Sequence, residues 1–481
     1  MKSVKSNILY NIIYQILILI IPLITAPYLS RVVGVDGVGI YSYTYSIVYY
    51  FMLVVLLGVN NYGNRTIAKS RSSIEELSKK FWEIYLLQLS IGIIMICIYC
   101  IYVFVFNIKF KLIAMIEILF ILSAIFDVNW FFFGVEEFKK TVIRNSIIKI
   151  GTLLLIFCFV RSKDDLWKYT LIMSGMTFLG QMLLWGYLRK IIKFVKIDYK
   201  NIIKHLKPNL LLFIPVIAVS IYKIMDKIML GSICNVNEVG FYENAEKIVN
   251  VPITLITALG TVMLPRITNM LSHGEDNKAK EYLEKSLDFI MFISFAMFFG
   301  LLCVGKNFAP LYFGKEFVKT GYLIMLLSST LPFISFANVL RTQYLIPKEK
   351  DKIYILSVIL GAVINTIMNF IFIPFFGSIG ACFGTIAAEF VVMFVQAYML
   401  RKEINMKKQV INIIPFFIKA LVMFVIISIF NYLNFNNVIR LVTQIAIGGT
   451  VYFILNFKYI CSMIDLKKVK TLFLKKQKIK M

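Results

Sequence analysis

The chain alternates long apolar segments with short polar ones, and residues 209–261 show this pattern most clearly. They predict two apolar helices joined by the short loop GSICNVNE. An apolar helix of about 20 residues is long enough to cross a bilayer. In the first helix Lys223, Asp226 and Lys227 lie at i, i+3 and i+4, so they share one face. The second helix carries a polar stripe at the same steps, which consists of Glu243, Glu246, Lys247, Asn250, Thr254, Thr257 and Thr261.

An ionisable side chain at membrane depth costs roughly 2.5 to 3.5 kcal/mol and therefore faces a bundle interior or a water-filled cavity. The two helices are thus expected to line a polar lumen. The first helix enters from the inner side, which places residues 223–230 and Glu243 in the outer third of the membrane.

The same apolar pattern recurs along the whole chain and predicts an all-α polytopic membrane protein. We expect fourteen spans, at residues 8–33, 38–62, 81–105, 112–134, 142–160, 166–188, 208–230, 239–263, 286–305, 320–342, 353–375, 378–400, 413–432 and 438–458. The content of 59% hydrophobic and only 16% charged residues supports this class and leaves no room for a soluble domain. We interpret the first apolar segment as a retained helix rather than a signal peptide, because no small-residue cleavage site follows it.

The net charge of +26 would suit a nucleic-acid partner, but its distribution follows the spans instead. With the N-terminus inside, 38 Lys and Arg residues fall on cytoplasmic segments, 11 on outer segments, and Lys223, Lys227 and Lys419 within spans. This asymmetry predicts that both termini are cytoplasmic. The basic linker 189–207 and the basic tail 459–481 are expected to contact anionic lipids, and no nucleic-acid partner is expected.

Neither the cysteines nor the histidines suggest a metal or catalytic centre. Cys97 and Cys100 form a CxxC pair within an apolar helix, which favours packing over metal binding. His205 and His273 fall in separate cytoplasmic connections. We therefore expect no metal, no catalytic residue and no enzyme activity.

A weak internal repeat suggests two halves of similar structure. VGIYSY at 38–43 returns as VGFYEN at 239–244, and Leu57-Gly58 before Arg65 resembles Leu259-Gly260 before Arg266. We predict an N-terminal lobe (1–188), a linker (189–207), a second lobe in the same orientation (208–400), two further helices (401–458) and a tail (459–481).

Several local features complete the expectations. GVDGVG (34–39) is expected to form a tight outer turn, Trp130 with three phenylalanines an interfacial belt, and residues 264–286 an amphipathic surface connection. Asp127 and Glu389 lie within apolar segments and are candidates for ion coupling, with structural carboxyl groups as the alternative. Lys419 is expected to be structural or lipid-facing.

Five segments together resemble the Wzx-type polysaccharide repeat-unit flippases of the MOP exporter superfamily, which also contains the MATE drug exporters and the lipid II flippases. They are PLITAPYLSRVVGVDGVGIYSY, LGVNNYGNR, FDVNWFFFGVEEF, MDKIMLG with VGFYENAEKI, and LPRI. The resemblance implies a pair of six-helix lobes that moves undecaprenyl-pyrophosphate-linked oligosaccharide from the inner to the outer leaflet of a bacterial cytoplasmic membrane. It implies no cofactor, leaves coupling to H⁺ or Na⁺ open, and suggests the polymerase and chain-length regulator of the same pathway as partners.

Two groups of residues are candidates for roles in such transport. At the inner mouth, Asn60, Asn61, Arg65, Arg144, Lys149 and Arg266 could bind the diphosphate, because arginine donates paired hydrogen bonds to phosphate. The alternative is an ordinary positive-inside collar. At the outer side, Arg31 could close a gate by pairing with Asp226 or Glu243, against static pairing among Lys223, Asp226, Lys227, Glu243, Glu246 and Lys247, whose charges sum to zero.

Three other functions remain open. A MATE-type drug or cation antiporter would favour an acidic and aromatic lumen, whereas basic residues are well represented here. A lipid II flippase fits the same span count. A membrane-embedded polymerase would need a large outer loop, and the predicted outer loops are short.

Overall fold

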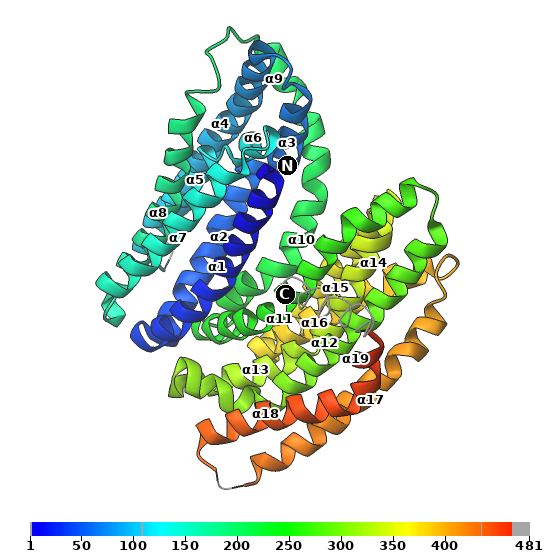
Figure 1. The fold of residues 1–481 in the computed structure, drawn as a ribbon. Helices are drawn as coiled ribbons and strands as arrows, with labels where there is room; N and C mark the ends of the chain where they lie inside the picture. The colour runs from blue at the N-terminus through cyan, green and yellow to red at the C-terminus, as the bar shows by residue number, and fades with distance from the viewer. Residues whose placement is uncertain (1, 107–108, 434, 464–481) are drawn as a thin grey trace, which may run out of the picture. The chain divides into compact units, whose positions relative to one another are not determined.

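The computed structural model describes residues 2–106, 109–433 and 435–463, and these contain helices and no strand (Figure 1). They form two compact units. The first contains residues up to 247 together with 358–388, and the second contains 248–357 together with residues from 389 onward. The long helices α11 (Val236–Ser272), α15 (Asp351–Phe376) and α16 (Ser378–Leu400) contribute to both. The predicted lobe boundaries stay a prediction.

The helices that lie wholly in the first unit are α1 (Lys2–Val32), α2 (Gly34–Leu56), α3 (Val59–Lys69), α4 (Ile74–Val105), α5 (Lys111–Ile125), α6 (Asn129–Gly134), α7 (Phe138–Phe159), α8 (Leu166–Leu188), α9 (Tyr199–Lys204) and α10 (Leu206–Ile233). Helix α2 is central to this unit and packs against α5, α4, α10 and α1.

The helices that lie wholly in the second unit are α12 (Asp276–Phe313), α13 (Val318–Ser328), α14 (Thr330–Leu340), α17 (Met406–Ser428), α18 (Asn437–Leu455) and α19 (Phe457–Met463). Helix α12 is central to this unit and packs against α13, α14, α17 and α18. The core contains Phe295, Phe299, Phe416 and Met423, and the hydroxyl of Tyr452 donates to the Phe292 carbonyl at 2.8 Å.

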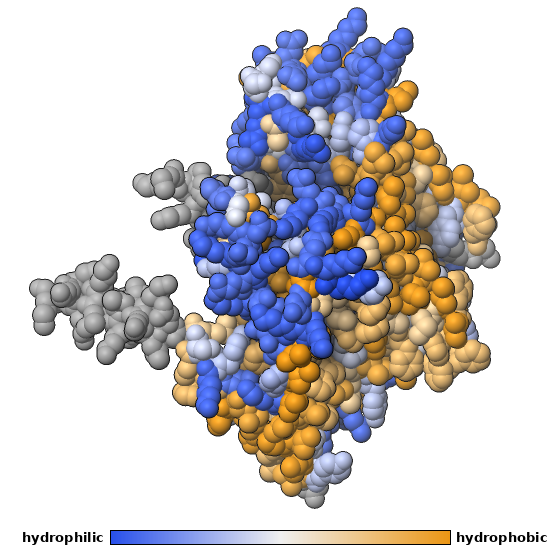
Figure 2. Space-filling model, turned by 90° about the vertical axis from the view of Figure 1, so that its right-hand side faces the viewer, coloured by the Kyte–Doolittle hydropathy of each residue, from blue (hydrophilic) through white to orange (hydrophobic). Residues whose placement is uncertain are grey.

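Length and composition confirm the polytopic class. Among the described residues, twelve helices are long and apolar enough to cross a membrane, or thirteen if the bent pair α13 and α14 is one span. Large apolar side chains such as Phe375, Ile367 and Leu154 are exposed. Figure 2 shows broad hydrophobic areas on the face in view, as expected for a surface that contacts lipid.

Three connections differ from their predicted form because the helices extend further into them. GVDGVG is not a loop: the chain turns at Val33, and α2 already begins at Gly34, which has a φ of 71°. The predicted loop GSICNVNE reduces to a turn at residues 234–235. The surface connection 264–286 belongs almost entirely to α11 and α12, with only residues 273–275 between them.

The predicted interfacial belt at Trp130 is wrong. Trp130, Phe131 and Phe132 are fully buried, and only Phe133 is exposed. Trp130 packs against Phe81 with ring centroids 5.5 Å apart and fills the space left by Gly63 of α3. The predicted fourth span is α5 followed by the short α6, with a break at residues 126–128, and the buried aromatic side chains of α6 belong to the core cluster around Phe81.

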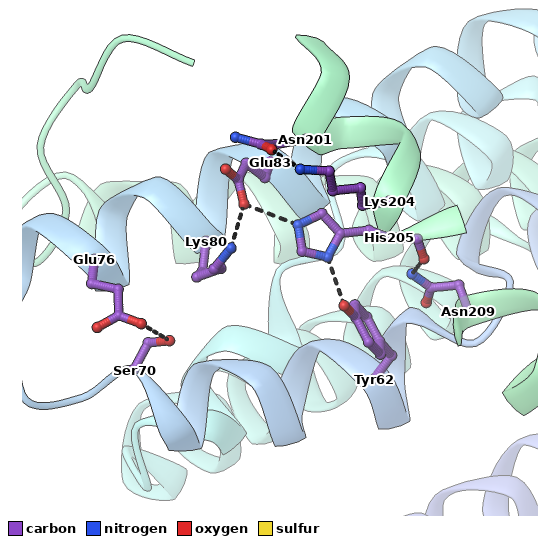
Figure 3. Close-up of polar contacts among 9 residues, drawn as sticks. All are labelled: Tyr62, Ser70, Glu76, Lys80, Glu83, Asn201, Lys204, His205 and Asn209. Carbon is purple, nitrogen blue, oxygen red and sulfur yellow. Dashed lines mark hydrogen bonds and ion pairs between the residues drawn. The ribbon is translucent and has the colours of Figure 1, made fainter. Parts of the chain in front are cut away.

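The linker between α8 and α10 contacts α4 near both of its ends, and Figure 3 shows the contact close to α10. Trp82 donates to the Lys193 carbonyl at 3.1 Å and stacks on Phe194. Further along, His205 is buried between the carboxylate of Glu83, at 3.0 Å, and the hydroxyl of Tyr62, at 2.7 Å (Figure 3). The linker is therefore fixed to α3 and α4 by specific polar contacts.

In the second unit the connection between α16 and α17 is held by Glu403. Its carboxylate accepts a hydrogen bond from Tyr344 at 2.6 Å and pairs with Lys350. These two partners lower the pKa of Glu403. Tyr344 belongs to a π-helical turn, Arg341–Leu345, which follows α14. The predicted tenth span is likewise divided, because α13 and α14 meet at a bend of 40°.

The two segments of the sequence repeat cross each other at their glycines. A Cβ atom on Gly39 would lie 1.8 Å from the carbonyl oxygen of Val236, and one on Gly240 would lie 2.4 Å from that of Val35. The two contacts are equivalent, since Gly39 and Gly240, like Val35 and Val236, are separated by 201 positions. We call this contact between α2 and α11 the glycine crossing. It is the arrangement expected where two related helices meet at a local twofold axis.

Gly39→Ala is expected to destabilise the protein. Alanine is the better helix former by about 1 kcal/mol, but its Cβ would force two backbones apart, which typically costs 1 to 3 kcal/mol or more. Thermal unfolding of the purified protein in detergent measures the effect. Gly186→Ala in α8 is the matched control, because nothing lies within 4 Å of its Cβ position. Equal melting temperatures for Gly39→Ala and the wild type would contradict the close crossing.

Candidate functional site

The ionisable residues of α10 and α11 are joined by ion pairs. The ammonium of Lys227 lies 2.7 Å from Glu243 and 2.8 Å from Glu246, and Lys247 lies 3.3 Å from Glu243. Lys227 is only 9% exposed. Burying a charge is tolerated where partners of opposite sign and hydrogen bonds replace its water. Two carboxylates around one buried ammonium meet that condition, and we refer to these four residues as the charged cluster.

The charged cluster also reaches α2, next to the glycine crossing. Ser42 donates to the Glu243 carboxylate at 2.8 Å, and these two residues are again 201 positions apart. Nearby, Asn244 donates to the hydroxyl of Ser30 in α1 at 2.8 Å. A small cavity of about 20 Å³ touches Glu243 and Lys247 and is closed by side chains of α1, α2 and α8. The repeat segments of α2 and α11 therefore meet through polar as well as backbone contacts.

A row of tyrosines runs along α2 from this point. Tyr41, Tyr45 and Tyr49 lie four residues apart, and their rings follow one another at centroid distances of 5.8 and 6.3 Å. Tyr169 of α8 contacts Tyr41 at 4.7 Å. Such a row presents aromatic faces and hydroxyl groups together, the combination that suits a polar ligand with apolar ring faces.

Asp226 lies in a separate cluster and has no cation as a partner among the described residues. It is 1% exposed and accepts hydrogen bonds from Tyr242 at 2.8 Å, Thr385 at 2.7 Å and Asn369 at 2.6 Å. Gly384 makes room for this geometry, since a Cβ there would lie 2.1 Å from the Asn369 amide oxygen. Three neutral donors stabilise the carboxylate without neutralising it. The cluster can therefore accept a proton or a small cation.

The remaining residues of the predicted gate lie outside both clusters. Lys223 and Asn250 are exposed, and no ion pair joins Lys223 to another described residue. Arg31 is exposed near the end of α1. In this conformation the carboxylates of Asp226 and Glu243 are engaged by the partners given above. The pairing of Arg31 with either of them stays a prediction.

The predicted inner-mouth residues differ in their surroundings. Asn60, Asn61 and Arg65 are exposed on α3, immediately after the break at Leu57, where φ is 41°. Arg144 of α7 is buried instead, and its guanidinium donates to the Asn129 side chain at 2.6 Å.

Two further residues were assigned to the inner mouth. Lys149 is half-buried in α7. In the second unit, Arg266 lies over the ring of Tyr282, with the guanidinium carbon 4.3 Å from the ring centroid. The common role of these residues as a diphosphate site stays a prediction.

The two carboxylates predicted for ion coupling are both in structured surroundings. Asp127 lies at the α5–α6 break and accepts from the backbone and side-chain nitrogens of Asn129, at 2.8 and 2.7 Å. These bonds stabilise the start of α6, and the coupling role of Asp127 stays a prediction. Glu389 is 8% exposed in α16. Its coupling role stays a prediction.

Several buried polar residues were not identified from the sequence. Asn369 and Thr385 lie more than 140 positions from Asp226, so no local spacing points to them. Glu117 has no charged residue within four positions in the sequence, and Glu83 and His205, which contact each other, are 122 positions apart. The available signal was polarity alone: Glu83 and Glu117 are carboxylates inside apolar helices, which calls for a partner or a proton.

Two protein-family models match this chain. A family model described as "Polysaccharide biosynthesis protein" matches residues 4–271, and one described as "Lipid II flippase MurJ" matches residues 169–452. The chain belongs to the Wzx-type polysaccharide flippases of the MOP superfamily. Membership in this family supports a multi-pass membrane transporter rather than a catalyst.

Two relatives match this flippase over nearly their whole length. A putative O-antigen transporter of Shigella dysenteriae is 25% identical over 81% of this chain and 98% of its own. A putative O-antigen transporter of Escherichia coli K12 is 24% identical over 83% of this chain and 97% of its own.

Solved structures confirm the fold. The inward closed conformation of lipid II flippase MurJ aligns with a TM-score of 0.76 at 17% identity, over 95% of this chain and 99% of that one. An inward-facing MATE multidrug transporter of the MOP superfamily aligns with a TM-score of 0.61 at 13% identity, over 81% and 99%. The flippase therefore has the MurJ and MATE type of fold that the resemblance implied.

Lys227→Met should destabilise the flippase strongly, because it leaves Glu243 and Glu246 close together without their shared cation. Removing one partner of a buried ion pair typically costs about 3 to 5 kcal/mol. Thermal unfolding in detergent measures this loss. The triple variant with Glu243→Gln and Glu246→Gln should recover much of it, and Lys223→Met, an exposed lysine of the same helix, serves as the control. If Lys227→Met unfolded like Lys223→Met, the ion pairs would not stabilise the structure.

Proposed function

We propose that this protein moves undecaprenyl-pyrophosphate-linked oligosaccharide repeat units from the inner to the outer leaflet of a bacterial cytoplasmic membrane by alternating access. The product would serve the assembly of an O-antigen, capsule or exopolysaccharide. The observation that carries the proposal is the match to putative O-antigen transporters over nearly their whole length. A probable low-salt glycan biosynthesis flippase of Haloferax volcanii matches half of this chain as well.

The geometry supports this function in two ways. Alternating access needs two elements that can separate and meet again, and the glycine crossing brings the equivalent ends of α2 and α11 together. A lipid-linked sugar also needs polar and aromatic side chains for its hydroxyl groups and rings. The tyrosine row of α2 and the charged cluster supply both.

Charge supplies a driving force for such a substrate. A diphosphate carries negative charge, and one charge moved through 100 mV changes in energy by about 2.3 kcal/mol. Outward movement from an inside-negative cell is therefore favourable. On this proposal Arg65, with Asn60 and Asn61, first contacts the diphosphate at the inner side, and the polymerase and chain-length regulator of the same pathway take over the product outside.

We propose further that a cation, H⁺ or Na⁺, resets the transporter, and that Asp226 is its site. Asp226 is buried among neutral donors, and the amide oxygen of the neighbouring Asn369 is buried with no hydrogen-bond partner in the described structure. Carboxylate, amide and hydroxyl oxygens are suitable ligands for a hard cation. Asp127 and Glu389 are the other candidates.

Lipid II transport is the second candidate function. The observation that favours it is the match of the "Lipid II flippase MurJ" family model to residues 169–452. A drug antiporter is supported by fold alone, because the aligned MATE structures are only 13 to 14% identical to this chain.

Complementation separates these functions. The gene is expressed in one strain that lacks its O-antigen flippase and in another depleted of its lipid II flippase. We expect restoration of surface polysaccharide in the first strain and no restoration of growth in the second. The reverse result would assign lipid II, and increased resistance to cationic drugs without either restoration would assign drug export.

Arg65→Ala should reduce export of surface polysaccharide at least tenfold at equal protein abundance, because paired hydrogen bonds to phosphate are lost. Lys69→Ala is the matched control, since Lys69 is also an exposed cation on α3. Polysaccharide on the cell surface is quantified by immunoblot against membrane content of the protein. Equal export by the two variants would leave Arg65 as part of a general basic collar.

A further inference from the structure

Glu117 of α5 is a buried carboxyl group that the proposed transport cycle does not use. It is fully buried, and among the described residues the hydroxyl of Thr44 lies 2.9 Å from its Oε1. The other oxygen, Oε2, is buried with no hydrogen-bond partner in the described part of the chain. No ion pair joins Glu117 to a described cation. Its surroundings thus differ from those of Asp226, which accepts three hydrogen bonds.

The hydrogen bonds around Thr44 fit a protonated Glu117 better than an ionised one. The Thr44 hydroxyl lies 2.9 Å from Glu117 and 3.0 Å from the carbonyl oxygen of Ile40, yet it has only one proton to donate. If Glu117 is ionised, this buried carboxylate accepts at most one side-chain hydrogen bond, and only when the Thr44 hydroxyl does not donate to Ile40. If Glu117 is protonated, its own hydroxyl donates to Thr44, and Thr44 donates to Ile40. Both bonds are then made.

The helices packed on α5 present no cation to Glu117. The titratable groups that face it are hydroxyls: Tyr41 and Tyr45 from α2, and Tyr99 and Tyr102 from α4. On α8, the third neighbour, Lys168 pairs with Asp165 at the start of the helix.

The lysines nearest in the sequence are also directed elsewhere. Lys111, at the start of α5, lies over the ring of Phe104 at 5.0 Å, and Lys109 lies 5.5 Å from the ring of Phe110.

A cavity extends from Thr44 to the connection between α4 and α5. The charge distribution predicts that this end of the two helices faces the outside. The cavity has a volume of about 150 Å³, enough for several water molecules. Thr44, the partner of Glu117, forms part of its wall. The other lining residues are Tyr43, Ile47, Tyr99, Tyr102, Lys109, Phe110 and Ala114. Lys109 is exposed, in the connection between α4 and α5.

We propose that Glu117 is a proton-binding site that exchanges its proton through this cavity, with Thr44 as the contact between the carboxyl group and cavity water. In the conformation described here Glu117 holds the proton. On release, the O–H bond of the acid breaks, the proton passes to water in the cavity, and the remaining carboxylate is stabilised by a hydrogen bond from Thr44. The inference goes beyond the proposed function and does not depend on it.

Infrared difference spectroscopy of the full-length protein in lipid tests the site without any transport measurement. The wild type minus Glu117→Gln spectrum at neutral pH should contain the carbonyl band of a carboxylic acid, shifted in D₂O. Glu75→Gln, which removes an exposed carboxylate of α4, should leave that band unchanged. If the difference spectrum instead contained only carboxylate bands, Glu117 would be ionised and the proposal would be overturned.

Two further measurements complete the test. Ile47→Phe adds volume to the cavity wall and should slow the exchange of the acid proton for deuterium at least several-fold, whereas unchanged exchange would overturn the route. If Glu117→Gln does not fold, the wild type is labelled with a hydrophobic carbodiimide, which reacts with protonated carboxyl groups, and is analysed by mass spectrometry. Labelling at Glu117 and not at Glu75 supports the proposal, and absence of label at Glu117 contradicts it.

Discussion

The close approach of Gly39 and Gly240 is the contact on which the arrangement of the first unit depends. Each glycine lies against a backbone carbonyl of the other helix, so no side chain of any kind fits between them. Helices that approach so closely without water gain dispersion contacts along their backbones, which is how small residues stabilise helix pairs in membranes. The crossing also determines what lies next to it: Ser42 contacts Glu243, and the charged cluster follows one turn further along α11.

Buried charge is handled differently at three places in this unit. The charged cluster balances lysines with carboxylates, so its net charge is zero and its partners restrain one another. Asp226 has no cation beside it among the described residues and accepts hydrogen bonds from neutral donors of α11, α15 and α16. Glu117 has neither arrangement. A transporter needs both kinds of environment, because paired charges fix a structure whereas an unbalanced group can respond to an ion.

The sequence was sufficient to predict the class of fold, because apolar segments of spanning length can hardly form anything other than membrane helices. It also identified the hairpin of α10 and α11 and the repeat at 38–43 and 239–244, since helical spacing is local information. Trp130 shows where such reasoning ends. It lies in a segment whose overall hydropathy is that of a membrane span, and hydropathy does not distinguish a side chain that faces lipid from one that faces the protein core. The partners of Asp226 were equally inaccessible, because they come from helices distant in the sequence.

The contacts between α2 and α11 are related by the same offset of 201 residues that separates the two repeat segments in the sequence. A sequence repeat alone shows that two segments have a common origin or a common constraint. Three contacts in the structure follow the same offset. The contact of Gly39 with Val236 becomes that of Gly240 with Val35 when each residue is replaced by its equivalent 201 positions away. The third contact joins Ser42 to Glu243, which are themselves 201 positions apart. Contacts on a local twofold axis must be made by equivalent residues, and such residues cannot change independently without loss of the fit. The departure from symmetry is therefore informative: serine faces glutamate at the axis, which places the negative charge, and the lysines that balance it, on the second repeat alone.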